Sequence, residues 1–255
     1  MNQMPPIVFK DVYKSFGTHR VLRGVSVTVR PGTVHFIMGR SGAGKSVLTR
    51  QVIGLLRPDS GQVLVDGQDV TKLDEQGFMA IRQKCQMIFQ HATLFESMSV
   101  LENVAMPIRK RFKASAQEAM QQAHQALEQV HLVEGLDRMP ADLGAGVKKR
   151  VAIARALALR PKMMLYDEPT TSLDPVSARR TDRLIREMAN KLGITSMVVS
   201  HDLASLRAIA DRVTFLDEGK VVFDGEPEAM LNAPNPVLKS FVGDPAKRWA
   251  PSDAA

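Results

Sequence analysis

The sequence has almost no cysteine, since Cys85 is the single one among 255 residues. One thiol excludes an internal disulfide and a cysteine-rich zinc site, and such sparse cysteine is typical of a reducing compartment. No apolar run approaches the roughly 18–20 residues that cross a bilayer. Residues 1–10 also lack the basic and long apolar regions of a signal peptide. We therefore expect a soluble cytoplasmic protein that reaches any membrane through a partner.

The composition that remains is that of an ordinary globular protein. It is 44% hydrophobic and 24% charged, and its Gly 17 and Pro 14 are close to average usage, which excludes collagen-like and low-complexity chains. Lys+Arg 34 against Asp+Glu 27 gives a formal charge of +7. This excess favours an anionic partner, which could be a nucleotide, a nucleic acid or lipid headgroups.

The hydrophobic pattern alternates between β and α at both ends of the chain, which predicts a parallel α/β core. Residues 7–29 alternate as antiparallel strands do, and residues 92–160 have helical spacing, with a capping box at Ser115–Glu118. Asp174 followed by proline predicts a helix start. The remaining expected elements are strands at 33–38, 63–65, 163–166 and 196–199, helices at 47–56 and 146–159, and a hairpin at 213–223.

Residues 39–46 read GRSGAGKS and match G-x-x-x-x-G-K-[ST] between a predicted strand and a predicted helix. The glycines let backbone N–H groups converge on nucleotide phosphates, and the helix N-terminus adds positive potential. Lys45 supplies a charge to these phosphates, and the Ser46 hydroxyl is a ligand for Mg²⁺. The motif predicts a phosphate-binding loop.

A second, acidic motif ends the apolar run at residues 163–166. An apolar strand that delivers a carboxylate at its C-terminal end is what a magnesium site opposite a phosphate-binding loop requires. We expect Asp167 to hold magnesium through water. Glu168 is expected to polarise the water that attacks the γ-phosphate.

With these motifs in order, the chain resembles the nucleotide-binding domain of ATP-binding-cassette (ABC) transporters over about residues 7–243. The resemblance implies that Tyr13 stacks on adenine, that Gln90 senses magnesium and contacts the transmembrane partner, and that Asp174 belongs to the D-loop at 172–174. It also implies that His201 hydrogen-bonds the γ-phosphate.

The resemblance further implies an α/β P-loop NTPase fold of ABC type, with a mixed, mainly parallel core sheet, an antiparallel β subdomain and an inserted α-helical subdomain. The expected domain is residues 1–243, with a RecA-like core at about 1–91 and 161–243 and the helical subdomain at about 92–160. Residues 244–255 are expected to form a frayed tail.

The signature loop departs from the family pattern, because residues 143–147 read LGAGV where Leu-Ser-Gly-Gly-Gln is usual. In the family this segment covers the ATP of the opposite subunit. Gly144 still suits a helix N-cap at a cost of a few tenths of a kcal/mol, but the missing hydroxyl removes a bond to a charged group worth about 1.5–3 kcal/mol. We expect a weakened ATPase. A cassette that only clamps ATP is the alternative, against which Glu168 and His201 argue.

The expected site combines catalytic, metal-binding and ATP-binding residues. The catalytic residues are Glu168, His201 and Lys45, and the metal ligands are Ser46, Gln90 and Asp167. The residues expected to bind ATP are Tyr13, Gly39, Arg40, Ser41, Gly42, Ala43, Gly44, Lys45, Ser46, Val47, Gln90, Gly144, Ala145, Gly146 and Asp174. Lys148, Lys149 and Arg150, which follow the signature loop, are expected to face either the ATP of the opposite subunit or solvent, and solvent is favoured.

Within the family, Val47 after the lysine–serine pair, the apolar Val147 and the segment 92–104 resemble the ATPase of Mla-type phospholipid transporters of diderm bacteria. The Mla resemblance implies an MlaE-like permease that docks on residues 92–107, an MCE-domain protein and a STAS-type regulator. The ABC resemblance itself implies a head-to-tail homodimer across two ATPs. The chain would then lie on the cytoplasmic side of the inner membrane. An ABC importer ATPase for amino acids or another small solute remains open. A soluble ABC ATPase acting on nucleic acid is less favoured, and we expect no nucleic-acid partner.

Overall fold

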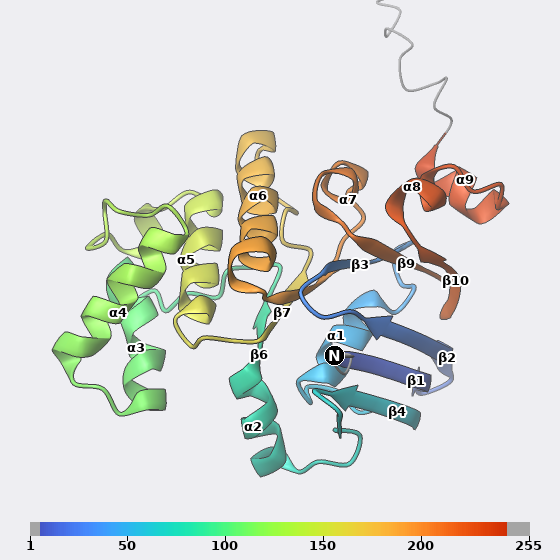
Figure 1. The fold of residues 1–255 in the computed structure, drawn as a ribbon, viewed down its shortest axis with the longest axis horizontal. Coiled ribbons are helices and arrows are strands. Elements are labelled where there is room, and N and C mark those ends of the chain that lie inside the picture. The colour runs from blue at the N-terminus through green and yellow to red at the C-terminus, as the bar shows by residue number, and fades with distance from the viewer. Residues whose placement is uncertain (1–5, 244–255) are drawn as a thin grey trace, which may run out of the picture.

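Two β-sheets form the centre of the computed structural model, which describes residues 6–243 (Figure 1). The larger sheet has the strand order β10-β9-β3-β8-β7-β6. From β9 to β6 neighbouring strands run parallel, and β10 pairs antiparallel with β9. Its strands are β3 (Val34–Gly39), β6 (Cys85–Ile88), β7 (Met163–Asp167), β8 (Thr195–Val199), β9 (Arg212–Asp217) and β10 (Lys220–Gly225).

The smaller sheet is antiparallel and contains the alternating N-terminal segment. Its order is β2-β1-β4-β5, with β1 (Ile7–Phe16), β2 (His19–Val29), β4 (Ser60–Val65) and β5 (Gln68–Asp69). Phe9 and Val63 on its inner face share one core with Leu48 and with Leu165 of β7. The period-2 pattern at residues 7–29 thus buries one face, as predicted.

Six helices surround these sheets within the described residues, and two of them show how sequence sets helix ends. α6 starts after Asp174, whose carboxylate accepts from the N–H groups of Val176 and Ser177, and it ends at Gly193. α1 stops at Val52, so the predicted extension to residue 56 was wrong, because Gly54 adopts a left-handed φ of 74°. The six helices are α1 (Lys45–Val52), α2 (Glu75–Lys84), α6 (Pro175–Leu192), α7 (Leu203–Ile209), α8 (Pro227–Leu231) and α9 (Pro236–Val242).

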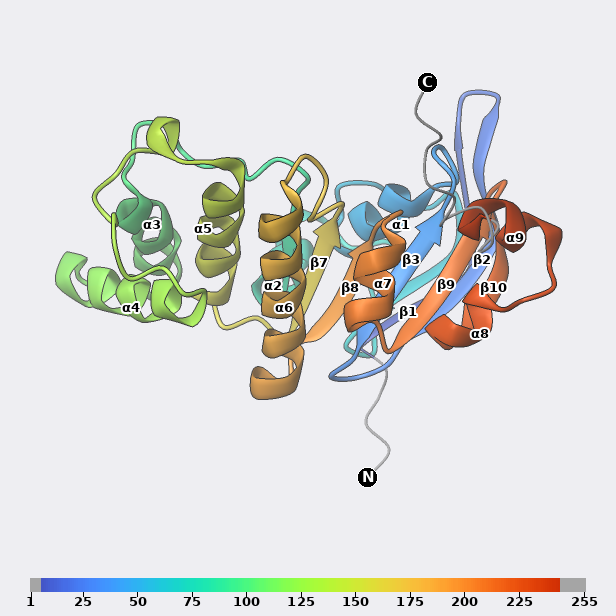
Figure 2. The ribbon, with the colours of Figure 1, turned by 90° about the horizontal axis from the view of Figure 1, so that it is seen from above.

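The middle of the chain forms a helical group at one end of the molecule, beside α6 and opposite α8 and α9 (Figures 1 and 2). The capping box at Ser115–Glu118 is present, and a second one joins Ser99 and Glu102. Val104 and Leu127 belong to the same core as Tyr166 of β7, so the group packs on the main sheet. Its elements are α3 (Val100–Phe112), α4 (Ala116–Gln129), a short 3₁₀ turn (Pro140–Asp142) and α5 (Ala145–Leu157).

The fold class expected from the sequence is confirmed, and the sheet order explains where a site can lie. Parallel strands β3, β8, β7 and β6 are neighbours and end at the same edge. Ligands of open α/β sheets bind at this edge. Among the described helices, none has the length and apolar character needed to span a bilayer. The proposed tail at 244–255 lies outside the described residues.

Candidate active site

The loop at residues 39–46 leaves β3 and enters α1, in the strand–loop–helix context that the motif requires. Gly44 is the N-cap of α1 with a left-handed φ of 96°, and a Cβ there would lie 2.6 Å from Leu22 Cδ2. Only glycine fits this approach of the loop to β2. Ser41 and Gly42 are exposed at its tip.

The Lys45 ammonium closes the loop on itself. Its Nζ donates to the carbonyl oxygens of Gly39 at 2.9 Å and Arg40 at 3.0 Å. Burial lowers the pKa of Lys45, and the nearby carboxylates of Glu168 and Asp167 oppose that effect. A cation held at the loop by two neutral carbonyls can turn its donors toward phosphate oxygens.

Three other residues in or next to the loop make contacts within the protein. The Arg40 guanidinium donates to Ser240 Oγ of α9 at 2.8 Å, so it reaches the C-terminal helix. Val47 has an apolar side chain, and its N–H is bonded to the Gly44 carbonyl at 3.1 Å. The Ala43 N–H likewise bonds inside the loop, to the Arg40 carbonyl at 3.2 Å. Phosphate contacts by these three residues stay predictions.

Two oxygen-bearing side chains that can bind a metal ion meet where the first turn of α1 lies beside the end of β7. Ser46 Oγ donates to Asp167 Oδ1 at 2.7 Å, and Arg50 lies at 4.0 Å from Asp167 Oδ2. A hydroxyl and a carboxylate are the hard ligands that Mg²⁺ takes, usually together with waters and phosphate oxygens. Among residues 6–243 no cluster of three acidic, histidine or cysteine side chains could hold a metal alone. The pair therefore fits a magnesium ion shared with a nucleotide.

Glu168 and His201 lie together beside this pair. The His201 Nδ1 is 3.1 Å from Glu168 Oε1 and 3.0 Å from Oε2, and Thr171 Oγ1 donates to Oε2 at 3.1 Å. Glu168 adopts a left-handed φ of 50°, and its N–H bonds the Val199 carbonyl of β8. The carboxylate is thus held from two loops while His201 stays 63% exposed. This arrangement suits a general base oriented by a histidine.

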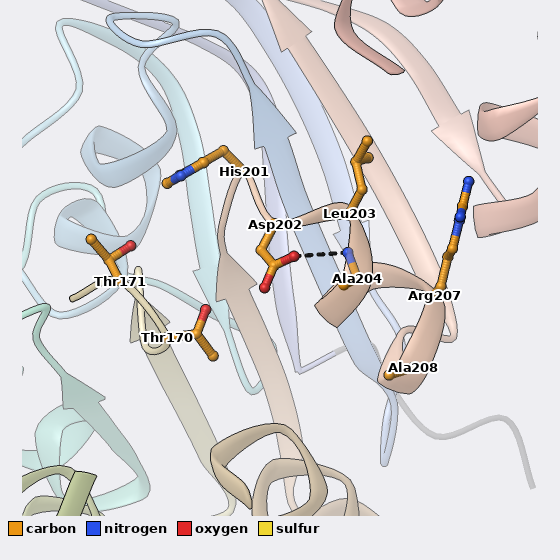
Figure 3. A pocket seen from close by; sticks show the side chains of 8 residues that line it. All are labelled: Thr170, Thr171, His201, Asp202, Leu203, Ala204, Arg207 and Ala208. Atoms are coloured by element: carbon orange, nitrogen blue, oxygen red, sulfur yellow. Dashed lines mark hydrogen bonds between the residues drawn. The ribbon is translucent and has the colours of Figure 1, made fainter. Parts of the chain in front are cut away.

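A cavity of about 790 Å³ lies beside His201, lined by the loop at Thr170 and Thr171 and by α7. Figure 3 shows the side chains that line it. Asp202 follows His201 and caps α7 by accepting from the Ala204 N–H at 2.8 Å. The open volume leaves the exposed imidazole accessible to a ligand or to another chain.

Sequence reasoning missed the network that fixes this cap. Arg179 of α6 pairs with both Asp202 and the buried Asp182, and Ser205 Oγ donates to the same two carboxylates at 2.8 and 3.0 Å. An i,i+3 Arg–Asp spacing on α6 is visible in the sequence, but its partner across the fold is not. The network ties α6 to the residue next to His201.

The network makes stability depend on pH through Asp182. Burial raises the pKa of Asp182 from 3.8 to about 6, against the opposing effects of Arg179 and Ser205. An acid with a raised pKa in the folded state binds its proton more tightly there, so its ionisation destabilises the fold. The destabilisation caused by ionised Asp182 is absent below about pH 4 and reaches its full size above about pH 6. The shift corresponds to roughly 2–3 kcal/mol.

We expect the free energy of unfolding of Asp182→Asn, measured relative to that of the wild type, to increase by about 2–3 kcal/mol when the pH is raised from 4 to 7. Urea unfolding at four pH values measures this difference. Glu187→Gln is the control, because Lys191 lowers the pKa of Glu187 and no such gain is expected. A difference between Asp182→Asn and wild type that is the same at every pH would contradict the assignment.

The signature loop lies at the N-terminus of α5, in the helical group. Gly144 is the N-cap of α5 with extended dihedral angles, and Ala145 is exposed. A Cβ on Gly146 would lie 2.5 Å from Ser177 Oγ, so α5 and α6 approach closely at this glycine. The two views place α5 and α1 on opposite sides of α6 and β7 (Figures 1 and 2).

The remaining expected ligands come from β1, from the segment after β6 and from the start of α6. Tyr13 on β1 is 47% exposed and pairs with Arg23 of β2, the strand that contacts the loop at Gly44. Gln90 is exposed and follows β6. Asp174 accepts from the N–H groups of Val176 and Ser177, so its observed contacts are those of a helix cap. Ligand contacts by these three residues stay predictions.

The expected exposure of Lys149 was wrong. Its side chain is buried, and Nζ donates to the carbonyl oxygens of Phe89 at 2.9 Å and Gln90 at 2.7 Å. Burial lowers the pKa of Lys149 to about 8, with Asp167 opposing the change. The sequence of residues 148–150 does not indicate which of the three cationic side chains is buried, because the carbonyl oxygens that accept from Lys149 lie far away in the sequence.

The comparison with family models identifies the protein family. The model described as "ABC transporter" matches residues 22–171, which is more than half of the chain. The chain belongs to the ABC transporter family. It is an ATP-binding cassette, an ATPase that uses ATP and Mg²⁺, as the motifs predicted.

Solved structures of cassettes have the same fold. The cassette MJ0796, solved as a dimer in a post-hydrolysis state with ADP and Pi, has a TM-score of 0.79 at 30% identity. The match covers 87% of this chain and 98% of the MJ0796 chain. The structure of cbiO1 of Clostridium perfringens, part of the ABC transporter complex cbiONQ, has a TM-score of 0.83 at 29% identity. The match covers 90% of this chain and 91% of cbiO1.

Curated relatives are methionine import ATP-binding proteins, MetN. That of Rhizobium johnstonii is 44% identical over 216 residues, which are 85% of this chain and 59% of the relative. That of Rhizobium etli is 42% identical over 91% of this chain and 64% of the relative. The chain therefore spans about three fifths of the length of these relatives.

Proposed function

We propose that the chain is the ATP-hydrolysing subunit of a membrane transporter and that it works as a head-to-tail homodimer. The observation that carries this proposal is the division of the site. Ser46, Asp167, Glu168 and His201 meet at one sheet edge, whereas the signature loop lies on α5 beyond α6. Two chains facing in opposite directions would each complete the nucleotide site of the other. The dimeric state described for the similar cassette MJ0796 supports this arrangement.

Each residue then has a task in hydrolysis. Lys45 neutralises phosphate charge, while Ser46 and Asp167 hold Mg²⁺, which polarises the phosphate oxygens when bound. Glu168 accepts a proton from the attacking water, and His201 orients that carboxylate through its Nδ1 contact. Closure of the two chains would exclude bulk water from this carboxylate, and release of phosphate would let them separate.

The permease partner is proposed to dock on residues 92–107. A cavity of about 250 Å³ lies there, lined by β6 and the loop after it, by Met106 and Pro107 of α3 and by residues of α5. Phe89 and Phe95 next to it are 36% and 45% exposed. Exposed aromatic side chains around a concave surface are typical of interface centres. A chain docked here would lie on the loop that carries Gln90.

For the cargo we put forward two candidates. The resemblance at residues 47, 92–104 and 147 supports phospholipid transport of the Mla type, with an MCE-domain protein and a STAS-type regulator as further partners. The MetN relatives support import of methionine or a similar small solute, at 44% identity over 85% of the chain. Either cargo would place the chain at the cytoplasmic face of a membrane, bound through its permease.

Purification through a tag on this chain from native membranes tests the proposal. A co-purifying polytopic permease, whose ATPase activity in proteoliposomes needs this chain, supports a transporter subunit. An MCE-domain companion selects phospholipid, and stimulation by methionine with its binding protein selects import. If no permease is recovered and the chain binds DNA or RNA with a steep salt dependence, the nucleic-acid alternative replaces the proposal.

Lys45→Ala is expected to weaken ATP binding by about 10- to 100-fold, because bonds from a charged donor to phosphate are worth about 1.5–3 kcal/mol. Fluorescence titration with a labelled ATP measures the change. Lys191→Ala, which removes an exposed lysine of α6 paired with Glu187, is the matched control. Unchanged affinity in Lys45→Ala would remove the loop at 39–46 from the nucleotide site.

A further inference from the structure

The helix behind the signature loop carries two cations whose partners are backbone carbonyls of a single loop. Lys149 Nζ donates to Phe89 O at 2.9 Å and to Gln90 O at 2.7 Å. Arg155, further along α5, donates from Nη1 to Thr93 O at 3.1 Å and from Nη2 to Ala92 O at 3.4 Å. We call these contacts the carbonyl clasp.

The burial of Lys149 indicates that the clasp does more than fill space. Its side chain is 2% exposed, and its hydrogen-bond acceptors within residues 6–243 are neutral carbonyl oxygens. An ammonium buried without a paired carboxylate is unfavourable, and an apolar side chain would pack on α5 at lower cost. What the ammonium adds is two directed bonds to the loop after β6.

The clasp joins the loop after β6 to α5, the helix that begins at the signature loop, and both line one cavity. Gln90 and Lys149 line a cavity of about 290 Å³ together with Ala145 of the signature loop and Ser172 of the loop before α6. Thr93 within the held segment adopts a left-handed φ of 46°, so this segment has a defined bend. The loop continues from the core sheet, whereas α5 belongs to the helical group.

We propose that Lys149 and Arg155 are positioning residues that couple the Gln90 loop to the signature loop, so that both move together when a nucleotide site closes. This inference rests on the proposed function, in which Gln90 belongs to one nucleotide site and the signature loop to the site of the second copy. A displacement of the Gln90 backbone at its own site is then passed along α5 to Gly144–Gly146. The clasp therefore links the two sites of the dimer.

Lys149→Met tests the coupling, since it keeps the length and the apolar stem but removes both donors. We expect kcat for ATP to fall about tenfold or more, while KM for ATP stays within about twofold, because the clasp atoms do not touch residues 39–46. Lys149→Gln retains N–H donors and should recover part of the loss. Arg150→Met is the matched control, because Arg150 donates to the His131 carbonyl at 2.9 Å, outside this loop. Its kcat should stay within about twofold of wild type.

Two further measurements distinguish coupling from a general loss of stability. If Lys149 acts through the Gln90 loop, kcat of Gln90→Ala/Lys149→Met should fall no further than kcat of Gln90→Ala; effects that multiply would overturn the proposal. Hydrogen exchange should become faster at amides of residues 89–93 in Lys149→Met, or in Lys149→Gln if Met prevents folding, and remain unchanged at residues 39–46. Unchanged exchange at 89–93 would also overturn it.

ATP hydrolysis by the wild-type protein distinguishes a failure of this inference from a failure of the proposed function. If the wild type hydrolyses ATP, depends on Lys45 and shows the same kcat as Lys149→Met, the clasp fails while the ATPase dimer stands. If the wild type does not hydrolyse ATP in the presence of Mg²⁺ and its permease, the proposed function itself fails.

Discussion

Glu168→Gln is expected to slow ATP hydrolysis by about 10²- to 10⁴-fold, the range that a positioned general base contributes. The amide keeps the shape of the side chain and can still bond Thr171 and His201, but it cannot accept a proton from water. ATP binding through Lys45 and Ser46 is untouched. The ATP-bound dimer should therefore accumulate, and gel filtration with ATP and Mg²⁺ should show a species of twice the mass of the nucleotide-free chain.

The chain offers a matched control for this substitution. Glu187 on α6 also lies beside a histidine, with Oε2 at 3.5 Å from the His131 Nε2, but at the surface of the helical region. Glu187→Gln should hydrolyse ATP at the wild-type rate and should form no trapped dimer. Wild-type turnover in Glu168→Gln would show that another group accepts the proton, and a monomer that hydrolyses ATP would contradict the head-to-tail assembly.

The parts of this structure that the sequence could predict depend on residues close together in the chain. The phosphate-binding loop lies between β3 and α1, Asp167 ends β7, and Ser115 and Asp174 cap their helices, each through contacts within a few residues. The parallel pattern also implied that these strand ends share one edge. Local propensity and topology rules are sufficient for such features.

What escaped prediction depends on partners distant in sequence. Lys149 is separated by 59 and 60 residues from the carbonyls that it holds, and Arg40 by 200 from Ser240. In its local segment Lys149 looks like a solvated surface residue, and Arg40 looks like a phosphate-binding residue of its loop. Only the packing of α5 against the loop after β6 turns Lys149 inward, and only the approach of α9 to the phosphate-binding loop brings Ser240 to the exposed Arg40.

The signature loop is where sequence and structure together predict a gain of activity. Gly144→Ser/Ala145→Gly should raise ATP turnover by roughly 10- to 100-fold, because a hydroxyl bonded to phosphate is worth about 1.5–3 kcal/mol if it acts in the transition state. The fold accepts the serine freely: a Cβ on Gly144 has no neighbour within 4 Å, and its extended dihedral angles are those of a serine N-cap. Removing the exposed Ala145 methyl should let the second chain approach more closely.

Because the signature loop is expected to act on the nucleotide of the second copy, the gain should appear in trans. A chain that combines Lys45→Ala with the restored signature cannot bind ATP well itself, yet it should raise turnover when mixed with wild type. Gly146→Ala is the opposite control, since its Cβ would lie 2.5 Å from Ser177 Oγ and should push α5 away from α6. Turnover that stays level or falls in Gly144→Ser/Ala145→Gly would mean that the missing hydroxyl does not limit hydrolysis. That result would favour the alternative in which the cassette binds ATP as a clamp and hydrolyses it poorly.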